Sequence, residues 1–213
     1  MTRITAPADF VLKNIIDTAV LQKSVDCGIG NLIDLGTGNG IPGLFISILN
    51  PDLEITLIDS IKKKIDFVDY IISELNLKNC SAVCGRIETV SLKNNLLLTN
   101  KASLLNNAPL KKTYYEKFDA ALGRALAELG QFIELSVPFV KTGGYIICQK
   151  SHKYEEELKS AEKIIKLCQL KLIDISEYQI EDNYRIIVKF KKEADTPKLF
   201  PRGVGKYKTK LPG

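Results

Sequence analysis

The sequence predicts an α/β fold with a largely parallel seven-stranded sheet, one antiparallel edge strand and helices on both faces. Short apolar segments alternate with helical segments through most of the chain, which is typical of parallel sheets covered by helices on both faces. The last two strand-like segments follow each other without a helix between them, which indicates an antiparallel edge. Glycines come directly after the first strand-like segment, where open α/β sheets bind nucleotides. Together these features predict a Rossmann-like domain.

Composition is that of a globular protein with a sizeable core. The chain has 213 residues, of which 45% are hydrophobic and 26% charged, and this excludes collagen-like, mucin-like and wholly disordered chains. No apolar run approaches the ~18 residues of a membrane span, and the first residues lack the apolar stretch of a signal peptide, so we expect a cytoplasmic protein. The five cysteines include no CxxC pair, so we expect neither a disulfide framework nor a metal site.

The first half of the chain is expected to hold a helical segment and the start of the α/β domain. Residues 1–30 form the N-terminal helical segment, because Pro7 suits a helix start and apolar residues recur at helical spacing from Val11 to Ala19. The α/β domain is expected over residues 31–192. Its first half has predicted strands at 31–35, 54–58 and 81–84 and predicted helices at 42–49 and 61–75.

The second half of the domain follows an expected loop insertion at 93–116, which is rich in Asn and Lys. Pro138 ends a predicted helix, because proline cannot continue the hydrogen bonding of the backbone. The remaining expected elements are strands at 118–122, 145–148, 170–176 and 185–192 and helices at 127–137 and 158–168.

A basic C-terminal tail is expected over residues 193–213. From Thr196 onward this tail has five basic residues and no acidic one, so it equals the whole net charge of +5. A localised positive segment is typical of a surface that binds a polyanion, and it is equally consistent with a solvated tail. Phe200 and Tyr207 lie among the basic residues and are suited to stacking on bases, although Phe200 is also suited to pinning the tail to the sheet edge.

The strongest functional signal is the segment from Asp34 to Gly40. Its glycines at 36, 38 and 40 allow a sharp turn and let a ligand lie against bare backbone. A second acid, Asp59, ends the next strand 19 residues after Gly40, where it can take both ribose hydroxyls of a nucleoside.

The glycine spacing distinguishes two cofactors. A dinucleotide fingerprint requires a glycine at position 41, and Ile41 stands there. The acid that opens the loop suits a cationic cofactor more than a pyrophosphate. S-adenosylmethionine carries an ammonium and a sulfonium and no phosphate, so we predict it as the cofactor. The alternative is a glycine-rich turn without a ligand.

This loop and several later segments resemble the bacterial ribosomal small-subunit methyltransferase G family, formerly called glucose-inhibited division protein B. The resemblance covers nearly the whole chain and rests on Asp34 to Gly43, Leu57-Ile58-Asp59-Ser60, Gly85-Arg86-Ile87-Glu88, Gly123-Arg124-Ala125, Pro138 through Gly143-Gly144, and the tail residues Thr196-Pro197, Phe200-Pro201-Arg202 and Gly205. It implies a class I methyltransferase that uses S-adenosylmethionine to methylate guanine N7 in the 530 loop of 16S ribosomal RNA. The implied partner is that RNA or the small ribosomal subunit, and we expect a monomer without membrane or metal.

The resemblance places cofactor contacts at Gly36, Ile41, Ile87, Glu88 and Arg124. Ile87 and Glu88 follow the third predicted strand, where an adenine edge can meet backbone groups; an ordinary strand-to-helix turn is the alternative. Arg124 ends the fourth strand, where a guanidinium can fix a carboxylate or a phosphate, or simply lie on the surface. The full predicted cofactor set is Asp34, Gly36, Gly38, Gly40, Ile41, Asp59, Ile87, Glu88 and Arg124.

Guanine N7 carries a lone pair and no proton at neutral pH, so its methylation needs no general base. We therefore predict no acid–base residue and expect catalysis mainly by positioning. The predicted RNA contacts are Lys150, Arg202, Lys206, Lys208 and Lys210, with Lys62 to Lys64 as further candidates.

The chain departs from the family at its start, where the family has a longer helical region, and at Asn14, where the family often has histidine. Three other classes are consistent with parts of the sequence. A nicotinamide-linked oxidoreductase fits the strand–helix–strand unit but lacks the third glycine and a Tyr-x-x-x-Lys pair. A small-molecule or protein methyltransferase fits the cofactor half but not the basic tail, and a non-catalytic RNA-binding protein can share the fold.

Overall fold

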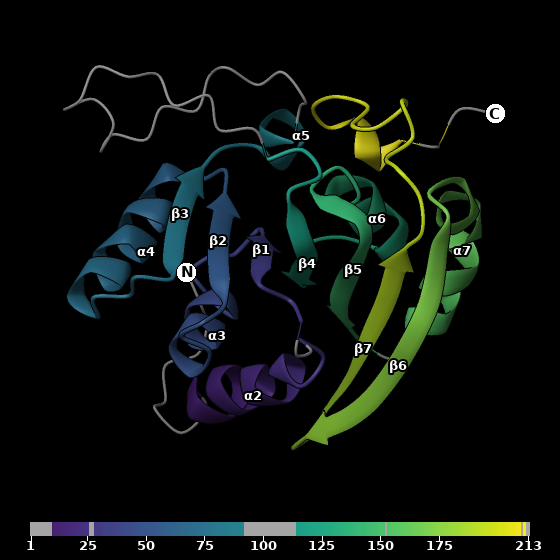
Figure 1. The fold of residues 1–213 in the computed structure, drawn as a ribbon. Helices are drawn as coiled ribbons and strands as arrows, with labels where there is room; N and C mark the ends of the chain where they lie inside the picture. Colours follow the sequence, from purple (N-terminus) through teal and green to yellow (C-terminus); the bar gives the residue numbers. More distant parts are fainter. Residues whose placement is uncertain (1–9, 26–27, 92–113, 152, 210, 212–213) are drawn as a thin grey trace, which may run out of the picture.

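The structure is a computed structural model that describes residues 10–25, 28–91, 114–151, 153–209 and 211 (Figure 1). The expected insertion at 93–116 therefore lies almost wholly outside the described residues. In chain order the elements are η1 (Val11–Ile16), α2 (Asp17–Gln22), β1 (Asn31–Leu35), α3 (Gly43–Leu49), β2 (Glu54–Asp59), α4 (Lys62–Glu74), β3 (Cys80–Cys84), α5 (Ile87–Val90), β4 (Phe118–Arg124), α6 (Leu129–Ser136), β5 (Val140–Lys150), α7 (Tyr154–Leu167), β6 (Leu170–Ile180), β7 (Asn183–Lys192) and η3 (Lys206–Lys208).

The seven strands form one sheet in the order β3-β2-β1-β4-β5-β7-β6, which confirms the predicted Rossmann-like α/β class. Strands β1 to β5 pair in parallel, and β7 is antiparallel to both of its neighbours, β5 and β6. The antiparallel strand is thus one position inside the edge and not at the edge itself. Glu181 and Asp182 join β6 to β7 in a hairpin, and this hairpin pairs with β5 through its second strand (Figure 1).

Each face of the sheet has its own apolar core. Side chains along a strand alternate between the two faces, so Leu32 packs with residues of α2, α3 and α4, whereas Ile33 packs with residues of α6 and α7. The α6 side of the core includes Phe132 and Phe139, which are almost entirely buried. Fully burying one such aromatic side chain contributes about 1.5–3 kcal/mol. The two cores fix the strand ends from which the functional loops extend.

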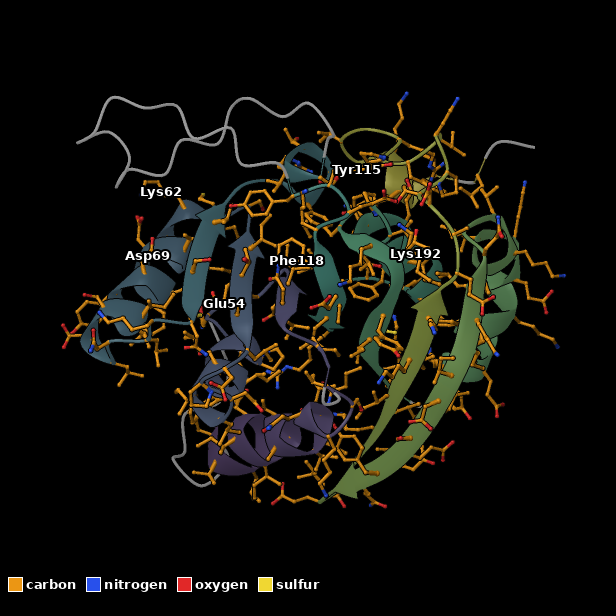
Figure 2. The ribbon with its side chains drawn as sticks, viewed as in Figure 1. Glu54, Lys62, Asp69, Tyr115, Phe118 and Lys192 are labelled. Atoms are coloured by element: carbon orange, nitrogen blue, oxygen red, sulfur yellow. The ribbon has the colours of Figure 1, made fainter. Side chains whose placement is uncertain are left out.

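The C-terminal segment folds back onto the domain beside α5 and α6 (Figure 1). Lys192, at the end of β7, is fully buried, and its ammonium donates hydrogen bonds to Glu116 Oε1 and Thr196 Oγ1, both at 2.7 Å (Figure 2). Phe200 then inserts into the α6 side of the core. The tail therefore has a defined path, and Phe200 pins it to the domain as one of the two sequence interpretations expects.

Within the part of the chain that the structure describes, none of the helices has the length and apolarity needed to cross a bilayer.

Candidate functional site

Two pockets open at the carboxyl ends of the parallel strands and meet at Ala125 and Leu126, just after β4. We call the first the glycine-loop pocket; it has a volume of about 330 Å³ and is lined by Gly36, Asp59, Ile87, Glu88 and Tyr207, among others. We call the second the arginine pocket; it has a volume of about 560 Å³ and is lined by Asn14, Asp17, Arg124, Gln149, Lys150 and Arg185, among others. Because both pockets are lined by Ala125 and Leu126, the pockets adjoin each other.

The glycine loop has a backbone that other residues rarely adopt. Gly36, Gly38 and Gly40 have φ angles of +70°, +63° and +89°. A Cβ at Gly36 would lie 2.5 Å from Leu126 Cδ1, and one at Gly40 would lie 2.3 Å from Leu44 Cδ1. A Cβ at Gly38 would meet nothing within 4 Å, so the loop leaves open space there. The sequence interpretation of a sharp turn with bare backbone is confirmed.

Asp34 lies beneath the loop and does not line either pocket. Its Oδ2 accepts hydrogen bonds from Thr37 Oγ1 at 2.7 Å and from the Gly43 backbone N–H at 3.1 Å. Burial raises the pKa of this carboxyl to about 6, against the opposing effect of those two hydrogen bonds. Asp34 therefore holds the two ends of the loop together from inside, whereas the sequence suggests a direct contact with a cationic ligand.

Asp59 ends β2 and lines the glycine-loop pocket, as its position in the sequence predicts. Its Oδ2 accepts a hydrogen bond from the Gly38 backbone N–H at 3.1 Å, and its Oδ1 accepts one from the Ile61 backbone N–H at 2.9 Å. Lys64 lies 3.3 Å from Oδ2. These contacts fix the carboxylate next to the loop, where its remaining lone pairs can accept hydroxyl groups.

Ile87 and Glu88 begin α5 and form another wall of the same pocket. Glu88 is buried, and its Oε1 accepts a hydrogen bond from the Gly205 backbone N–H at 2.9 Å. The C-terminal tail thereby reaches the pocket, where Tyr207 lines it. Sequence reasoning missed this contact, because nothing local to residues 203–207 indicates which part of the fold they touch.

The charges of the glycine-loop pocket suit a nucleoside without phosphates. Its two cationic side chains, Lys64 and Arg86, each lie beside a carboxylate of the same pocket, that of Asp59 at 3.3 Å and that of Glu88 at 3.6 Å. A pyrophosphate requires donors that are not already neutralised. S-adenosylmethionine has hydroxyls, an adenine and cationic groups, and the residues present fit it.

Arg124 lies in the arginine pocket, at the end of β4. Its Nη2 donates to Asn14 Oδ1 at 2.9 Å, and its Nη1 lies 3.3 Å from Asp17 Oδ2. The buried Asp17 also accepts hydrogen bonds from Gln149 Nε2 and from the Tyr178 hydroxyl, both at 2.7 Å. This network joins the N-terminal segment to β4, β5 and β6. Sequence reasoning named Arg124 but not the residues that hold it, which are distant along the chain.

Two of the predicted RNA contacts form ion pairs within the protein. Lys150 is partly buried in the wall of the arginine pocket, and its ammonium lies 2.6 Å from both Ala127 O and Glu157 Oε2. The Arg202 side chain is 7% exposed and makes a bidentate ion pair with the buried Glu134, at 2.8 and 2.6 Å. Each of these two cations is thus paired with a carboxylate of the protein, and Lys150 faces the arginine pocket instead of the outer surface.

The other predicted RNA contacts have different positions. Lys206 and Lys208 are exposed on η3. Lys210 lies outside the described residues. Lys62, at the start of α4, is exposed and points away from the domain (Figure 2), but it pairs with Asp66 one turn later. The exposed basic surface of the tail is therefore smaller than its composition suggests.

The chain is similar to proteins of one family over most of its length. A family model described as rRNA small subunit methyltransferase G matches residues 1–186. A protein named ribosomal RNA small subunit methyltransferase G from Lachnoclostridium phytofermentans is 36% identical over 209 residues, which cover 97% of this chain and 79% of that protein. The protein of the same name from Clostridium botulinum strain 657 is also 36% identical, over 96% of this chain and 80% of that protein.

Solved structures share the fold at low sequence identity. A SAM-dependent methyltransferase from Aquifex aeolicus superposes with a TM-score of 0.57 at 16% identity, over 87% of this chain and 93% of that one. TYW2 from M. jannaschii in complex with AdoMet gives a TM-score of 0.59 at 15% identity, over 89% of this chain and 79% of that one. At these identities the likeness concerns the arrangement of the strands and helices.

Proposed function

The chain belongs to the rRNA small subunit methyltransferase G family, and from this membership we propose that it transfers the methyl group of S-adenosylmethionine to N7 of a guanine in the 530 loop of 16S ribosomal RNA. The observation that carries the proposal is the family match over residues 1–186, which includes both pockets except for the tail residues. The two cationic side chains of the glycine-loop pocket are each paired with a carboxylate, and this supports a cofactor without phosphates.

The glycine-loop pocket is assigned to the nucleoside end of the cofactor. Asp59 accepts the ribose hydroxyls, and the backbone of Gly36 and Gly38 lies against the chain that joins the ribose to the methionine end. Ile87 and Glu88 bound the adenine. Arg124 is assigned to the carboxylate of the methionine end; Asn14 and Asp17 each contact one of its two Nη atoms and thereby fix the orientation of the guanidinium. Ile41, half-buried in the turn that enters α3, supports the loop.

When bound, S-adenosylmethionine supplies an electrophilic methyl group on its sulfonium. Guanine N7 carries no proton that must be removed, so the residues of the protein act by holding the base and the donor in line at the place where the two pockets meet, beside Ala125 and Leu126. Positioning of this kind can contribute several kcal/mol to the lowering of a barrier, roughly 7–11 kcal/mol in the best cases.

The substrate is the small ribosomal subunit or its RNA, bound by a monomer in the cytoplasm. The exposed Lys206 and Lys208 on η3 lie on the part of the tail that also touches the glycine-loop pocket, so they are placed to meet RNA phosphates near the reacting base. We retain the division into a helical segment over 1–30, a methyltransferase domain over 31–192 and a tail over 193–213, with the addition that the first and last parts each contribute residues to a pocket.

Methyl transfer to isolated small subunits tests the proposal. Purified protein and S-adenosylmethionine labelled on its methyl group are incubated with subunits, and the RNA is digested and analysed by mass spectrometry. We expect one 7-methylguanine in the 530-loop fragment. Label in another fragment, on another atom or in ribosomal protein contradicts the proposal.

A further inference from the structure

Two amide side chains in the arginine pocket are almost completely buried, yet each is bonded on one side only. Asn14, on η1, is 4% exposed, and Gln149, near the end of β5, is 5% exposed; both line the pocket. Among the described residues, the only fully buried side-chain nitrogen or oxygen without a partner is Thr18 Oγ1. The unbonded ends of Asn14 and Gln149 therefore have access to the pocket.

The bonded ends determine which atom each amide presents. Asn14 Oδ1 accepts from Arg124 Nη2 at 2.9 Å, so its Nδ2 donor remains. Gln149 Nε2 donates to Asp17 Oδ1 at 2.7 Å and also lies 2.5 Å from the Tyr178 hydroxyl, so its Oε1 acceptor remains. A 180° rotation of the Asn14 amide would place its NH₂ against the guanidinium of Arg124. The same rotation of the Gln149 amide would place its carbonyl oxygen against the carboxylate of Asp17. Asp17 and Arg124 thus lock one donor and one acceptor into the pocket.

We propose that this locked pair reads the acceptor base as guanine, with Asn14 Nδ2 donating to O6 and Gln149 Oε1 accepting from N1–H. The inference rests on the proposed function, because it concerns the base on which that function acts. Guanine has an acceptor and a donor side by side at these two positions, whereas adenine has an amino donor at position 6 and a bare lone pair at N1. With N7 directed at the methyl donor, adenine would place two donors together and two acceptors together.

Asp17 and Arg124 act in this scheme as positioning residues. Asp17 accepts from Gln149 and Tyr178 and pairs with Arg124 and Arg185, so its lone pairs are used within the protein. Its contribution is to fix the amide orientations, and a site with fixed polar groups rejects a mismatched base because those groups would be left unpaired.

The variant Asn14→Asp tests the assignment, because aspartate keeps an oxygen for Arg124 and replaces the donor by a second acceptor. Small subunits are assembled from ligated RNA with either guanine or isoguanine at the target position. Isoguanine has an amino group at position 6 and an N1–H, so it presents two donors. We expect the variant to methylate guanine roughly tenfold or more slowly than the wild type, and to prefer isoguanine, which the wild type disfavours.

The result that overturns the inference is a variant that keeps the wild-type preference for guanine over isoguanine. Gln131→Glu, which makes the same amide-to-acid change outside the arginine pocket, is the matched control and should keep both rate and preference. If Asn14→Asp fails to fold, the wild-type protein alone tests the inference. It should methylate subunits with 2,6-diaminopurine at the target position at least about tenfold more slowly than subunits with guanine there. Equal rates there contradict the inference.

The same assays separate this inference from the proposed function. A wild-type protein that leaves guanine N7 unmethylated in intact subunits contradicts the proposed function itself. A wild-type protein that methylates N7 but does not distinguish guanine from the exchanged bases contradicts only the reading by Asn14 and Gln149.

Discussion

The two pockets are built in different ways. The glycine-loop pocket depends on a contiguous motif, since Gly36 to Gly40 turn between β1 and α3 and bond to the neighbouring β2. The arginine pocket is assembled from η1, α2, β4, β5 and β7, which bring together residues such as Asp17 and Arg185 that are far apart in the sequence. A contiguous motif can be recognised in a single sequence, whereas a network of distant side chains becomes visible only after the chain folds.

The tail complicates this contrast, because it makes the glycine-loop pocket depend on a distant segment as well. Replacing Arg202 with alanine tests that dependence and should have the largest effect. The buried Glu134 would lose its partner, so we expect the free energy of unfolding to fall by about 3 kcal/mol or more. Because the Gly205 contact to Glu88 would loosen, affinity for S-adenosylmethionine should fall roughly tenfold, which is about 1.4 kcal/mol.

Thermal unfolding and calorimetric titration measure these two effects. Lys208→Ala is the control, because this exposed side chain touches neither carboxylate. Cofactor affinity unchanged in a folded Arg202→Ala protein would show that the tail and the pocket are independent.

Alanine at Gly40 tests whether the loop shape is as rigid as its contacts indicate. The new Cβ would lie 2.3 Å from Leu44 Cδ1 at a φ of +89°, so we expect a loss of about 2–3 kcal/mol in stability. Gly38→Ala is the matched change in open space, where backbone strain of about 1–2 kcal/mol is the only cost. Denaturant titration compares the two variants, and equal losses would argue against steric crowding at Gly40.

The pH dependence of stability tests the buried position of Asp34. Its pKa of about 6 lies above the unfolded value, so the folded state keeps the proton between about pH 4 and pH 6. Stability from this group is therefore highest at low pH and is lost as pH rises through 6, where the buried carboxyl must ionise. An asparagine side chain at this position can accept the Thr37 and Gly43 hydrogen bonds without charge, since both go to a single oxygen.

As the pH rises from 4 to 8, the free energy of unfolding of Asp34→Asn should therefore increase relative to that of the wild type by on the order of 2 kcal/mol. Chemical denaturation at a series of pH values checks this difference. A constant difference across the range would mean that the carboxyl ionises as easily in the folded protein as in the unfolded chain.

The smallest expected effect is that of Lys206→Ala. Loss of this exposed lysine should weaken binding of small-subunit RNA only slightly at low salt and leave cofactor affinity unchanged. The slope of the logarithm of the RNA-binding constant against the logarithm of the salt concentration should become shallower by about one. Filter binding over a range of salt concentrations measures the slope. An unchanged slope would remove η3 from the RNA-binding surface.

Much of the fold and one of the two pockets can be predicted from the sequence. The alternation of apolar and helical segments predicts the parallel sheet, because periodicity reports local burial. The position of β7 inside the edge cannot be predicted in this way, since it depends on which strand of the β6–β7 hairpin pairs with β5. Gly36, Asp59 and Glu88 can be identified as pocket residues because they follow successive parallel strands.

The roles of charged residues are harder to predict. The sequence indicates that Lys150 and Arg202 meet RNA, because composition counts charges without showing their partners. Glu157 and Glu134, the partners of those two residues, lie on α7 and α6 and are identified only by the folded structure. Charge in a sequence therefore predicts a binding surface only for residues that folding leaves exposed.

A structure with S-adenosylmethionine bound tests most directly whether the glycine-loop pocket holds the methyl donor and leaves the arginine pocket to the acceptor base. We expect the ribose on Asp59, the adenine beside Ile87, and the sulfonium methyl facing the arginine pocket where the two pockets meet, beside Ala125 and Leu126. A donor found with its methyl group turned away from the arginine pocket, or bound outside the glycine-loop pocket, would contradict the account.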